Sequence, residues 1–426
     1  MHCYTKDIPN INGKKVRVAG FVEAIRDIGK LKFLVLRDRE GKIQVTSRDE
    51  EIGRVINSLT KESFIVVDGR VKLNKQAPNG REIIPKKIDV LSRAETPLPL
   101  DISGKIESTL DKRIDWRFID MRNPKNMSVF ILQSDIVKYI SDFMHKNGFI
   151  RIFTSRLTNA ATEGGANYFP ILYFEKEGFL AQSPQLYKES ILASGIDRVY
   201  DIGFVYRAEP HHTPRHLCEY VSFDLEMVCN SLLDILNMEQ AMIKFVFRKI
   251  NEKNKEILDM YGINLEVPNR IPRLTFNEAN EILSKLSVRI DDYDLSQEGE
   301  KEICKYCEER YGTGLVFITE FPFKKKPFYI MRKENSDLCY SFDLLFRGLE
   351  ITSGGQREHR YDKRVENLRL KGLDPRKYDH LRFWRYGMPP HGGFAIGLER
   401  LTMQILKLDN VREATLLPRD PERLTP

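Results

Sequence analysis

The sequence predicts an α+β protein in which a small N-terminal β-barrel precedes a larger domain, an antiparallel sheet flanked by helices. Three observations lead to this prediction. At 426 residues the chain exceeds the size of one ordinary core, so two domains are expected. Five short β-branched runs, separated by turn residues, fill residues 1–95. A charged hairpin at 203–227 and a glycine-rich strand leading into a helix at 387–406 predict the sheet of the larger domain.

The first 95 residues have the pattern of a closed barrel. The predicted strands are VRVAGFVEAI, KLKFLVLRD, GKIQVTS, ESFIVVDGRVKL and EIIPKKIDVLS, with the helical run EEIGRVINSL between the third and the fourth. This order fits an OB-fold over 1–95, a barrel that binds single-stranded nucleic acid by stacking bases on aromatic residues. Phe33 is a candidate for such stacking because Lys32 and Arg37 lie near it, and Gln44 is on the next strand. The alternative for Phe33 is a core position.

The segment that follows is predicted to be a hinge or linker at 96–125, because three prolines stand among charged residues. The larger domain is expected at 126–426. Its first helix, at 127–147, has one apolar face and ends before Gly148, where a helix C-cap is expected. Helical runs alternating with polar turns predict a helical insertion around 231–310, without recognisable chemistry.

The hairpin at 203–227 is predicted to have one apolar and one charged face, because strand side chains alternate. So many charges on one face require ligands, metals or partners if the face is buried. The alternative is a solvated outer face with surface ion pairs. The charged face and its loop carry Arg207, Glu209, Arg215, His216, Ser222, Asp224 and Glu226.

The stretch 387–406 has glycines that permit close backbone approach, followed by a helix with Arg400 in its first turn. An arginine beside such a backbone is well placed to meet phosphate. Together the two stretches resemble motifs 2 and 3 of the class II aminoacyl-tRNA synthetases, and the resemblance covers nearly the whole chain. It implies an ATP-dependent ligase, with an anticodon-binding barrel and a class II catalytic domain.

The resemblance also implies the residues that hold ATP and its cofactor, Mg²⁺. Strand alternation places Asp343 and Glu350 on opposite faces unless Gly348 marks a β-bulge. The implied Mg²⁺ ligands are Glu350 and Ser353, with Asp343, all through oxygen. The implied ATP-binding residues are Arg207, Glu209, Arg215, His216, Leu217, Glu350, Gly397, Leu398, Glu399 and Arg400.

The segments QSPQLYK and SGGQREH resemble the aspartyl branch of this class, of the archaeal and eukaryotic kind. Lys188 and Arg357 would converge on the side-chain carboxylate of L-aspartate, since an amide would leave a buried lysine unpaired. Asparaginyl enzymes, the nearest branch, lack that lysine. There are two alternatives to an aspartyl enzyme. One is an asparaginyl-tRNA synthetase of the same class, and the other is a tRNA-binding paralogue that does not catalyse the reaction. The implied aspartate-binding residues are Glu163, Gln185, Lys188, Arg207, Ser353 and Arg357.

The resemblance further implies the partners of the chain. Phe33 and Gln44 match anticodon-contacting positions. Strict archaeal aspartyl enzymes tend to carry tryptophan at the position of Glu23 and lysine at that of Pro78, so we expect charging of both tRNA(Asp) and tRNA(Asn). The helix at 127–147 and the next strand resemble motif 1, which implies a homodimer, although Ser155 replaces the family's proline.

Composition excludes several classes of protein. No run of about 18 apolar residues occurs and the N-terminus lacks a signal-peptide core, so a cytoplasmic protein without membrane association is expected. A net charge of +7 is compatible with binding a polyanion. Cys304 and Cys307 form a lone CxxC, which we interpret as two neighbours on a helix rather than as a zinc or redox site.

Overall fold

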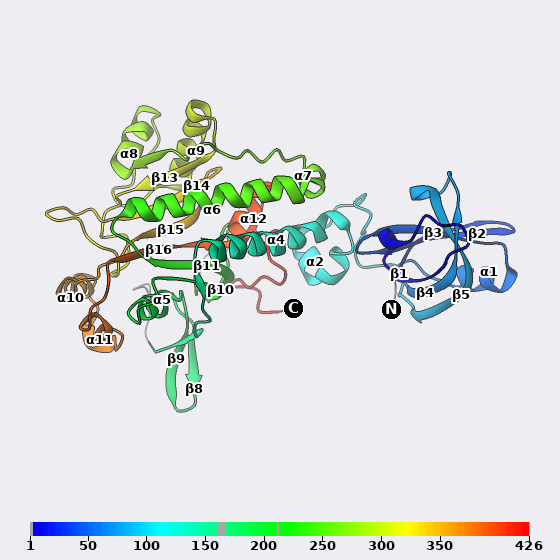
Figure 1. Ribbon diagram of the computed structural model, residues 1–426, viewed down its shortest axis with the longest axis horizontal. Coiled ribbons are helices and arrows are strands. Elements are labelled where there is room, and N and C mark those ends of the chain that lie inside the picture. The colour runs from blue at the N-terminus through cyan, green and yellow to red at the C-terminus, as the bar shows by residue number, and fades with distance from the viewer. Residues whose placement is uncertain (1–2, 160–166, 211–212, 426) are drawn as a thin grey trace. The chain divides into compact units, whose positions relative to one another are not determined.

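The computed structural model describes residues 3–159, 167–210 and 213–425. The chain divides into two compact units, Met1–Glu107 and Ser108–Pro426 (Figure 1). The predicted hinge at 96–125 falls across this division.

The first unit is a closed five-stranded barrel with strand order β1-β2-β3-β5-β4, which confirms the predicted OB-fold architecture. Inward-facing aliphatic residues of alternate strand positions, such as Leu34, Leu36, Ile43 and Val45, form its core. The elements are η1 (Thr5–Asp7), β1 (Lys15–Ile28), β2 (Leu31–Asp38), β3 (Gly41–Ser47), α1 (Glu50–Asn57), β4 (Phe64–Leu73), η2 (Pro78–Gly80) and β5 (Arg81–Ser92).

The second unit begins with two short helices, α2 (Leu110–Asp115) and α3 (Arg117–Asp120), inside the segment that was predicted to be a hinge or linker. The buried guanidinium of Arg117 donates hydrogen bonds to the backbone carbonyls of Arg412, Thr415 and Leu416. These bonds attach residues 108–120 to the C-terminal part of the same unit.

An eight-stranded sheet organises the second unit, with strand order β12-β13-β14-β15-β16-β11-β10-β6. Only the outer pairs β12–β13 and β10–β6 are parallel, so the predicted antiparallel sheet flanked by helices is confirmed. The strands are β6 (Ile150–Arg151), β10 (Arg198–Tyr206), β11 (Glu219–Val228), β12 (Arg273–Thr275), β13 (Leu315–Thr319), β14 (Ser341–Phe346), β15 (Leu349–Gln356) and β16 (His391–Gly397).

Two long helices, α4 (Pro124–Lys146) and α6 (Leu232–Lys253), lie side by side against this sheet (Figure 1). Buried residues of α6 belong to the main hydrophobic core, so the first helix of the predicted insertion is part of the central architecture. The rest of that segment contains α7 (Lys255–Met260), α8 (Phe276–Lys285) and α9 (Gln297–Tyr311). Cys304 and Cys307 are buried neighbours on α9, in a separate apolar cluster with α8 and β13.

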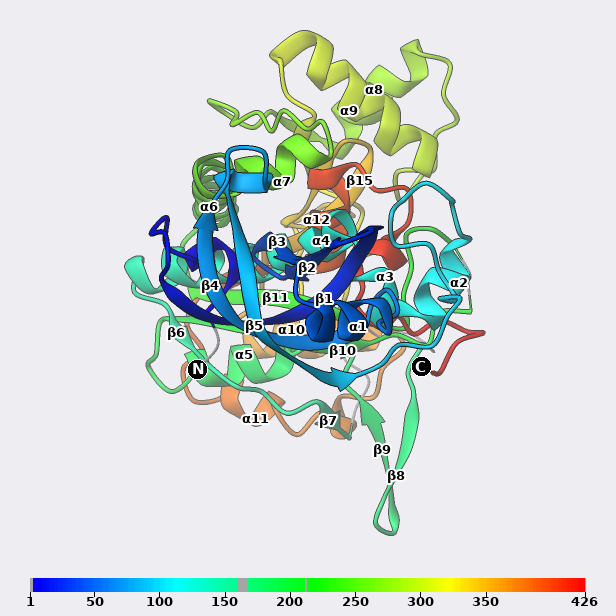
Figure 2. The same ribbon diagram turned by 90° about the vertical axis from the view of Figure 1, so that its right-hand side faces the viewer.

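The remaining elements surround the sheet. The segment expected as one strand after Gly148 forms two short strands, β6 and β7. Ser155, which lies between them, bonds through its hydroxyl to the backbone of Leu157, the first residue of β7. A three-stranded sheet of order β7-β9-β8 projects from the unit (Figure 2). Within the described part of the chain, no helix has the length and apolar character needed to cross a membrane. The other bounds are β7 (Leu157–Thr158), β8 (Pro170–Tyr173), β9 (Lys176–Leu180), α5 (Gln185–Leu192), α10 (Tyr361–Leu370), η3 (Pro375–Lys377), α11 (Leu381–Trp384), α12 (Leu398–Leu406) and η4 (Val411–Ala414).

Candidate active site

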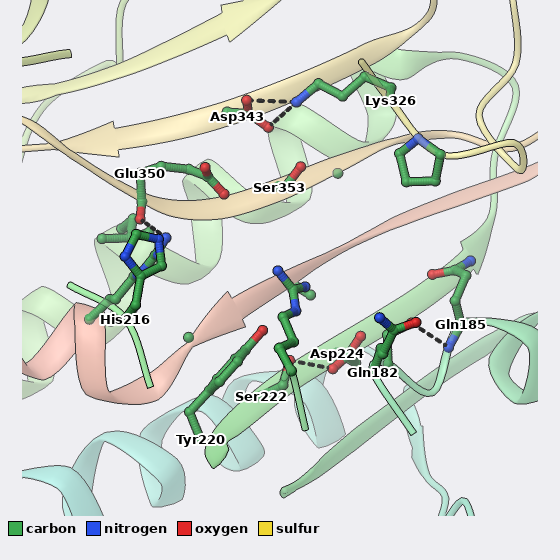
Figure 3. A pocket seen from close by; sticks show the side chains of 18 of the residues that line it. Gln182, Gln185, His216, Tyr220, Ser222, Asp224, Lys326, Asp343, Glu350 and Ser353 are labelled. Carbon is green, nitrogen blue, oxygen red and sulfur yellow. Dashed lines mark hydrogen bonds and ion pairs between the residues drawn. The ribbon is translucent and has the colours of Figure 1, made fainter. Parts of the chain in front are cut away.

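A cavity of about 340 Å³ lies on the face of the sheet formed by β11, β14, β15 and β16 (Figure 3). Ser222 and Asp224 of β11 line it, whereas Phe223 and Leu225 point into the hydrophobic core, as the alternation predicts. The first strand of the hairpin ends at Tyr206, so Arg207 and Glu209, which also line the cavity, extend from the segment after it.

One end of the cavity collects arginine side chains. Arg215 and Arg400 lie together there, and Arg207 lines the same cavity. Arg400, in the first turn of α12, donates to the backbone carbonyl of Glu350 at 3.1 Å and to that of Arg215 at 3.2 Å. The guanidinium of Arg215 pairs with Glu300 of α9, a residue that no sequence motif marks as functional. This end has the donor groups that a polyphosphate needs.

The other residues predicted to bind ATP lie around these arginines, with one exception. His216 bonds to the Thr213 hydroxyl through Nδ1 at 2.6 Å and lies 3.5 Å from Glu209 through Nε2. Leu217, Gly397 and Glu399 also line the cavity, and burial raises the pKa of Glu399 to about 7. Leu398 instead packs in the hydrophobic core, because its side chain faces the sheet from the start of α12.

The oxygen ligands predicted for Mg²⁺ all line the cavity, because β15 carries a β-bulge. The pairing of β14 with β15 shifts by one residue between Leu344 and Leu345, which leaves Ile351 as the extra residue. The bulge brings Glu350 to the same side as Ser353 (Figure 3). It lies at Ile351 and not at Gly348, which has φ +81° in the turn between the strands.

Lys326 is a further cation in the cavity that the sequence analysis did not identify. Its Nζ lies 2.7 Å from both carboxylate oxygens of Asp343 (Figure 3). Burial acts to lower the pKa of Lys326, but the charges of Asp343 and Glu350 and the hydrogen bond to Asp343 together raise it. The carboxylate of Asp343 is therefore already engaged by Lys326 and by the Ser353 hydroxyl. Glu350 and Ser353 still offer a hard cation oxygen ligands outside that ion pair.

The opposite end of the cavity is lined by Gln182, Gln185 and Arg357. Arg357 Nε donates to Oε1 of Glu226 at 2.8 Å, and its Nη2 donates to Oε1 of Gln185 at 3.2 Å. Gln185 Nε2 in turn donates to Oε2 of Glu226 at 3.0 Å. Gly393 leaves room for this carboxylate, because a Cβ there would lie 2.6 Å from Oε2.

Lys188 converges on the same carboxylate from α5. Its Nζ lies 3.0 Å from Asp224 Oδ1 and 3.4 Å from Glu226 Oε2, and its side chain is fully buried. Lys188 and Arg357 therefore meet at Glu226 rather than pointing apart. The sequence predicts two cations that await a ligand, whereas in the structure each of them already has a carboxylate partner. Glu163, the remaining residue predicted to bind aspartate, lies outside the described residues.

Phe33 and Gln44 lie on one outer face of the barrel, on the paired strands β2 and β3. Phe33 is partly exposed and does not belong to the barrel core, so the alternative core position does not apply. Gln44 Nε2 donates to Oε2 of the buried Glu82 at 2.9 Å, which turns the amide oxygen of Gln44 away from that carboxylate.

The two positions predicted to govern tRNA choice lie in the same unit. Glu23 is at a register shift of β1 and pairs with Lys42 at 2.7 Å and Arg37 at 3.6 Å. Pro78 is exposed at the start of η2, between β4 and β5.

Comparisons with known proteins cover both units. A family model described as tRNA synthetases class II (D, K and N) matches residues 109–421, and one for the OB-fold nucleic acid binding domain matches 16–91. An aspartate–tRNA(Asp) ligase of Pyrococcus abyssi is 46% identical over 433 residues, covering 99% of each chain. An aspartate–tRNA(Asp/Asn) ligase of Aeropyrum pernix is 44% identical over 427 residues, covering 97% of this chain and 96% of that protein. The crystal structure of asparaginyl-tRNA synthetase from Pyrococcus horikoshii complexed with asparaginyl-adenylate has a TM-score of 0.93 at 30% identity, covering 100% of both chains.

Proposed function

Because the chain belongs to the class II aminoacyl-tRNA synthetases of the aspartate, lysine and asparagine group, we propose that it is an aspartate–tRNA ligase. The observation that supports the choice of amino acid is that Arg357, which lines one end of the cavity, meets the buried Lys188 at Glu226, although Lys188 itself does not line the cavity. The relatives named for aspartate match the full length of the chain at 41–46% identity.

The reaction has two steps. The α-carboxylate of aspartate attacks the α-phosphorus of ATP, the bond to pyrophosphate breaks, and aspartyl-adenylate forms. A hydroxyl of the terminal ribose of tRNA then attacks the activated carbonyl carbon, and AMP leaves. Such chemistry depends on positioning and on stabilising the charge that builds up on phosphate oxygens.

The arginine-rich end of the cavity would hold the triphosphate. Arg207 would contact the α-phosphate and the substrate carboxylate, and Arg400 the far end of the triphosphate. Arg215 and His216 would line the remaining nucleotide site, with Glu209 towards the adenine. Their side chains are in reach of one cavity, and Arg400 is fixed by two backbone carbonyls.

Mg²⁺ fits the oxygen atoms on the β15 side of the cavity and, when bound, supplies positive charge to the triphosphate. Glu350 and Ser353 would hold it, because the bulge at Ile351 directs both towards the cavity. Asp343 would take part only if its ion pair with Lys326 opened.

Selection of aspartate over asparagine would depend on Arg357, whose guanidinium lines the cavity, with Lys188 behind Asp224. An asparagine side chain brings no charge to this site, so the pair of cations would gain nothing from it. ATP–pyrophosphate exchange with each amino acid tests this assignment. We expect exchange with aspartate; exchange with asparagine alone would reverse it.

For the tRNA substrate, we propose that the enzyme charges both tRNA(Asp) and tRNA(Asn). Pro78 and Glu23 differ from the residues of the strict pattern, and relatives named for both specificities match the chain at similar identity. Phe33 and Gln44 would contact the anticodon. Aspartylation of a tRNA(Asn) transcript is the expected result, and its strict refusal would make the enzyme specific for tRNA(Asp).

We also propose that the chain forms a homodimer and acts in the cytoplasm, where translation takes place. Apolar side chains of the motif 1 region are exposed in the single chain: Ile131 is 43%, Ile150 51% and Phe153 83% exposed. Light scattering of the purified chain should give about twice the monomer mass of 49.7 kDa. A monomer mass at micromolar concentration would contradict this.

A further inference from the structure

A buried charge cluster extends behind the amino-acid end of the cavity, beyond the residues predicted from the sequence. Glu189 of α5 and Arg364 of α10 are both fully buried, and Arg364 Nη2 lies 2.6 Å from Glu189 Oε2. His391, at the start of β16, is also fully buried, with its Nε2 3.3 Å from Glu189 Oε1. Glu189, Glu226 and His391 have ligand atoms within 4.8 Å of one another. The arginines that face both carboxylates account for their charge without a metal ion.

Both ring nitrogens of His391 face acceptors that have no hydrogen to donate. Nδ1 lies 2.7 Å from the carbonyl oxygen of Pro389, and Nε2 faces the carboxylate of Glu189. Glu189 is ionised: burial acts to raise its pKa, but Arg364 and then His391 lower it to about 2. A neutral imidazole has only one N–H and would turn a lone pair towards one of these oxygens.

The net charge of the cluster depends on whether the His391 ring is neutral or protonated. Without His391, it contains three cations (Lys188, Arg357 and Arg364) and three carboxylates (Glu189, Asp224 and Glu226). A substrate carboxylate would then enter a balanced site. With an imidazolium at His391, the cluster carries one excess positive charge before the substrate arrives.

We propose that His391 is held as a buried imidazolium, a positioning residue whose charge prepares the amino-acid pocket for a side-chain carboxylate. The inference rests on the proposed function, since it assigns the excess charge to the side chain of aspartate. His391 does not line the cavity and acts through Glu189, Glu226 and Arg357, whose backbone N–H bonds to its carbonyl oxygen at 2.9 Å.

The other groups around His391 do not replace this charge. His359 lies beyond Arg357 and has its pKa lowered, chiefly by burial. His380, beside α11, has its pKa lowered to about 3 by burial and by Arg364. Both rings are therefore neutral near pH 7, and Trp384 of α11 packs against His391 with 6.3 Å between ring centroids.

Nitrogen NMR on the full chain with ¹⁵N-labelled histidine tests the charge directly. At pH 7, without substrate, His391 should show two protonated ring nitrogens; a single protonated nitrogen would overturn the proposal. His391→Gln identifies the signal by removing it. Because this measurement needs no substrate, its outcome does not depend on whether the enzyme selects aspartate.

A second test uses only the unsubstituted protein and so does not depend on whether the variant folds. It measures aspartate binding by calorimetry in buffers with different ionisation enthalpies. Binding at pH 7 should take up no proton at His391, because the proton is already in place. Uptake of about one proton per aspartate would show that the ring was neutral, and so overturn the proposal.

The kinetic test compares His391→Gln with His359→Gln as a matched control. We expect His391→Gln to raise KM for aspartate roughly tenfold, with a smaller change in kcat and little change in KM for asparagine. Equal changes for both amino acids, or the same change in His359→Gln, would show a merely structural role.

Discussion

The two ends of the cavity hold their cations in different ways. At the amino-acid end, Lys188 and Arg357 are buried and bound to carboxylates that are at most 3% exposed. At the phosphate end, the Arg215 side chain is 15% exposed and its partner Glu300 comes from α9, outside the central sheet. The guanidinium of Arg400 donates there to two backbone carbonyls.

This difference matches what each end would have to do. A site that distinguishes a carboxylate from an amide benefits from charges fixed before the substrate arrives. A site that accepts a triphosphate and releases pyrophosphate benefits from cations whose partners can exchange. The end that would select the amino acid therefore has buried cations with buried carboxylate partners. The end that would bind ATP and release pyrophosphate has a more exposed cation, whose partner comes from outside the central sheet.

The largest effect is expected from Arg357→Ala, which removes the guanidinium that lines the pocket and leaves Glu226 without its nearest cation. Breaking a buried pair costs about 3–5 kcal/mol. Aspartate-dependent exchange should therefore fall by roughly 10²-fold or more. Arg360→Ala is the matched control, since Arg360 is partly exposed and pairs with Glu358. An equal loss in both variants would remove Arg357 from the site.

Glu239 is a buried carboxyl that forms no ion pair among the described residues, so its ionisation can be compared with that of the paired carboxylates at the amino-acid end. Burial raises the pKa of Glu239 to about 8, although the side chain of Thr352 acts to lower it. Since an unfolded glutamate ionises near pH 4.3, the folded state loses stability as pH rises from there through about 8. The slope is about 1.4 kcal/mol per pH unit.

Glu239→Gln should remove that slope, so that denaturant unfolding gives a larger free energy than the unsubstituted protein above neutral pH. Glu226 is the contrasting carboxyl: burial acts to raise its pKa, but Arg357 and Lys188 lower it. A Glu239→Gln variant with an unchanged pH profile would show that the carboxyl is solvated.

The barrel offers a third kind of surface, on which the aromatic side chain of Phe33 is partly exposed. Phe33→Ala should raise KM for tRNA about tenfold, because a stacked base contributes about 1–3 kcal/mol. Exchange without tRNA and thermal stability should stay unchanged, since Phe33 is not in the barrel core. A loss of exchange activity would show that the substitution perturbs more than tRNA binding.

The smallest effect concerns the contact between Glu300 and Arg215. If Glu300 competes with phosphate for this guanidinium, Glu300→Gln should lower KM for ATP a few-fold, corresponding to about 1 kcal/mol. KM for aspartate should not change. A higher KM for ATP would instead show that Glu300 holds Arg215 in its working position.

The sequence predicted the strand faces but not the contacts made across them. Period-two alternation placed Ser222 and Asp224 on the cavity side, and the glycines of β16 marked its close packing against β11. No local pattern could join Lys188 to Asp224, 36 residues away, or Arg215 to Glu300. Those pairs depend on how elements pack in three dimensions.

The pairing register of the strands was the other feature that the sequence could not predict. The bulge at Ile351 changes which residues of β15 face the cavity, and its position depends on pairing with β14. Leu398 was predicted to meet ATP as part of a continuous motif, yet the direction of its side chain at the start of α12 places it in the core. A motif identifies a segment, whereas the backbone decides which of its side chains reach the cavity.

The most direct test of a fixed, charge-selective pocket is a crystal structure of the full chain with L-aspartate bound. We predict that the side-chain carboxylate lies against the Arg357 guanidinium while the Arg357–Glu226 and Lys188–Asp224 pairs stay closed. An aspartate whose side chain binds elsewhere, or an Arg357 that leaves Glu226 to reach it, would contradict the account.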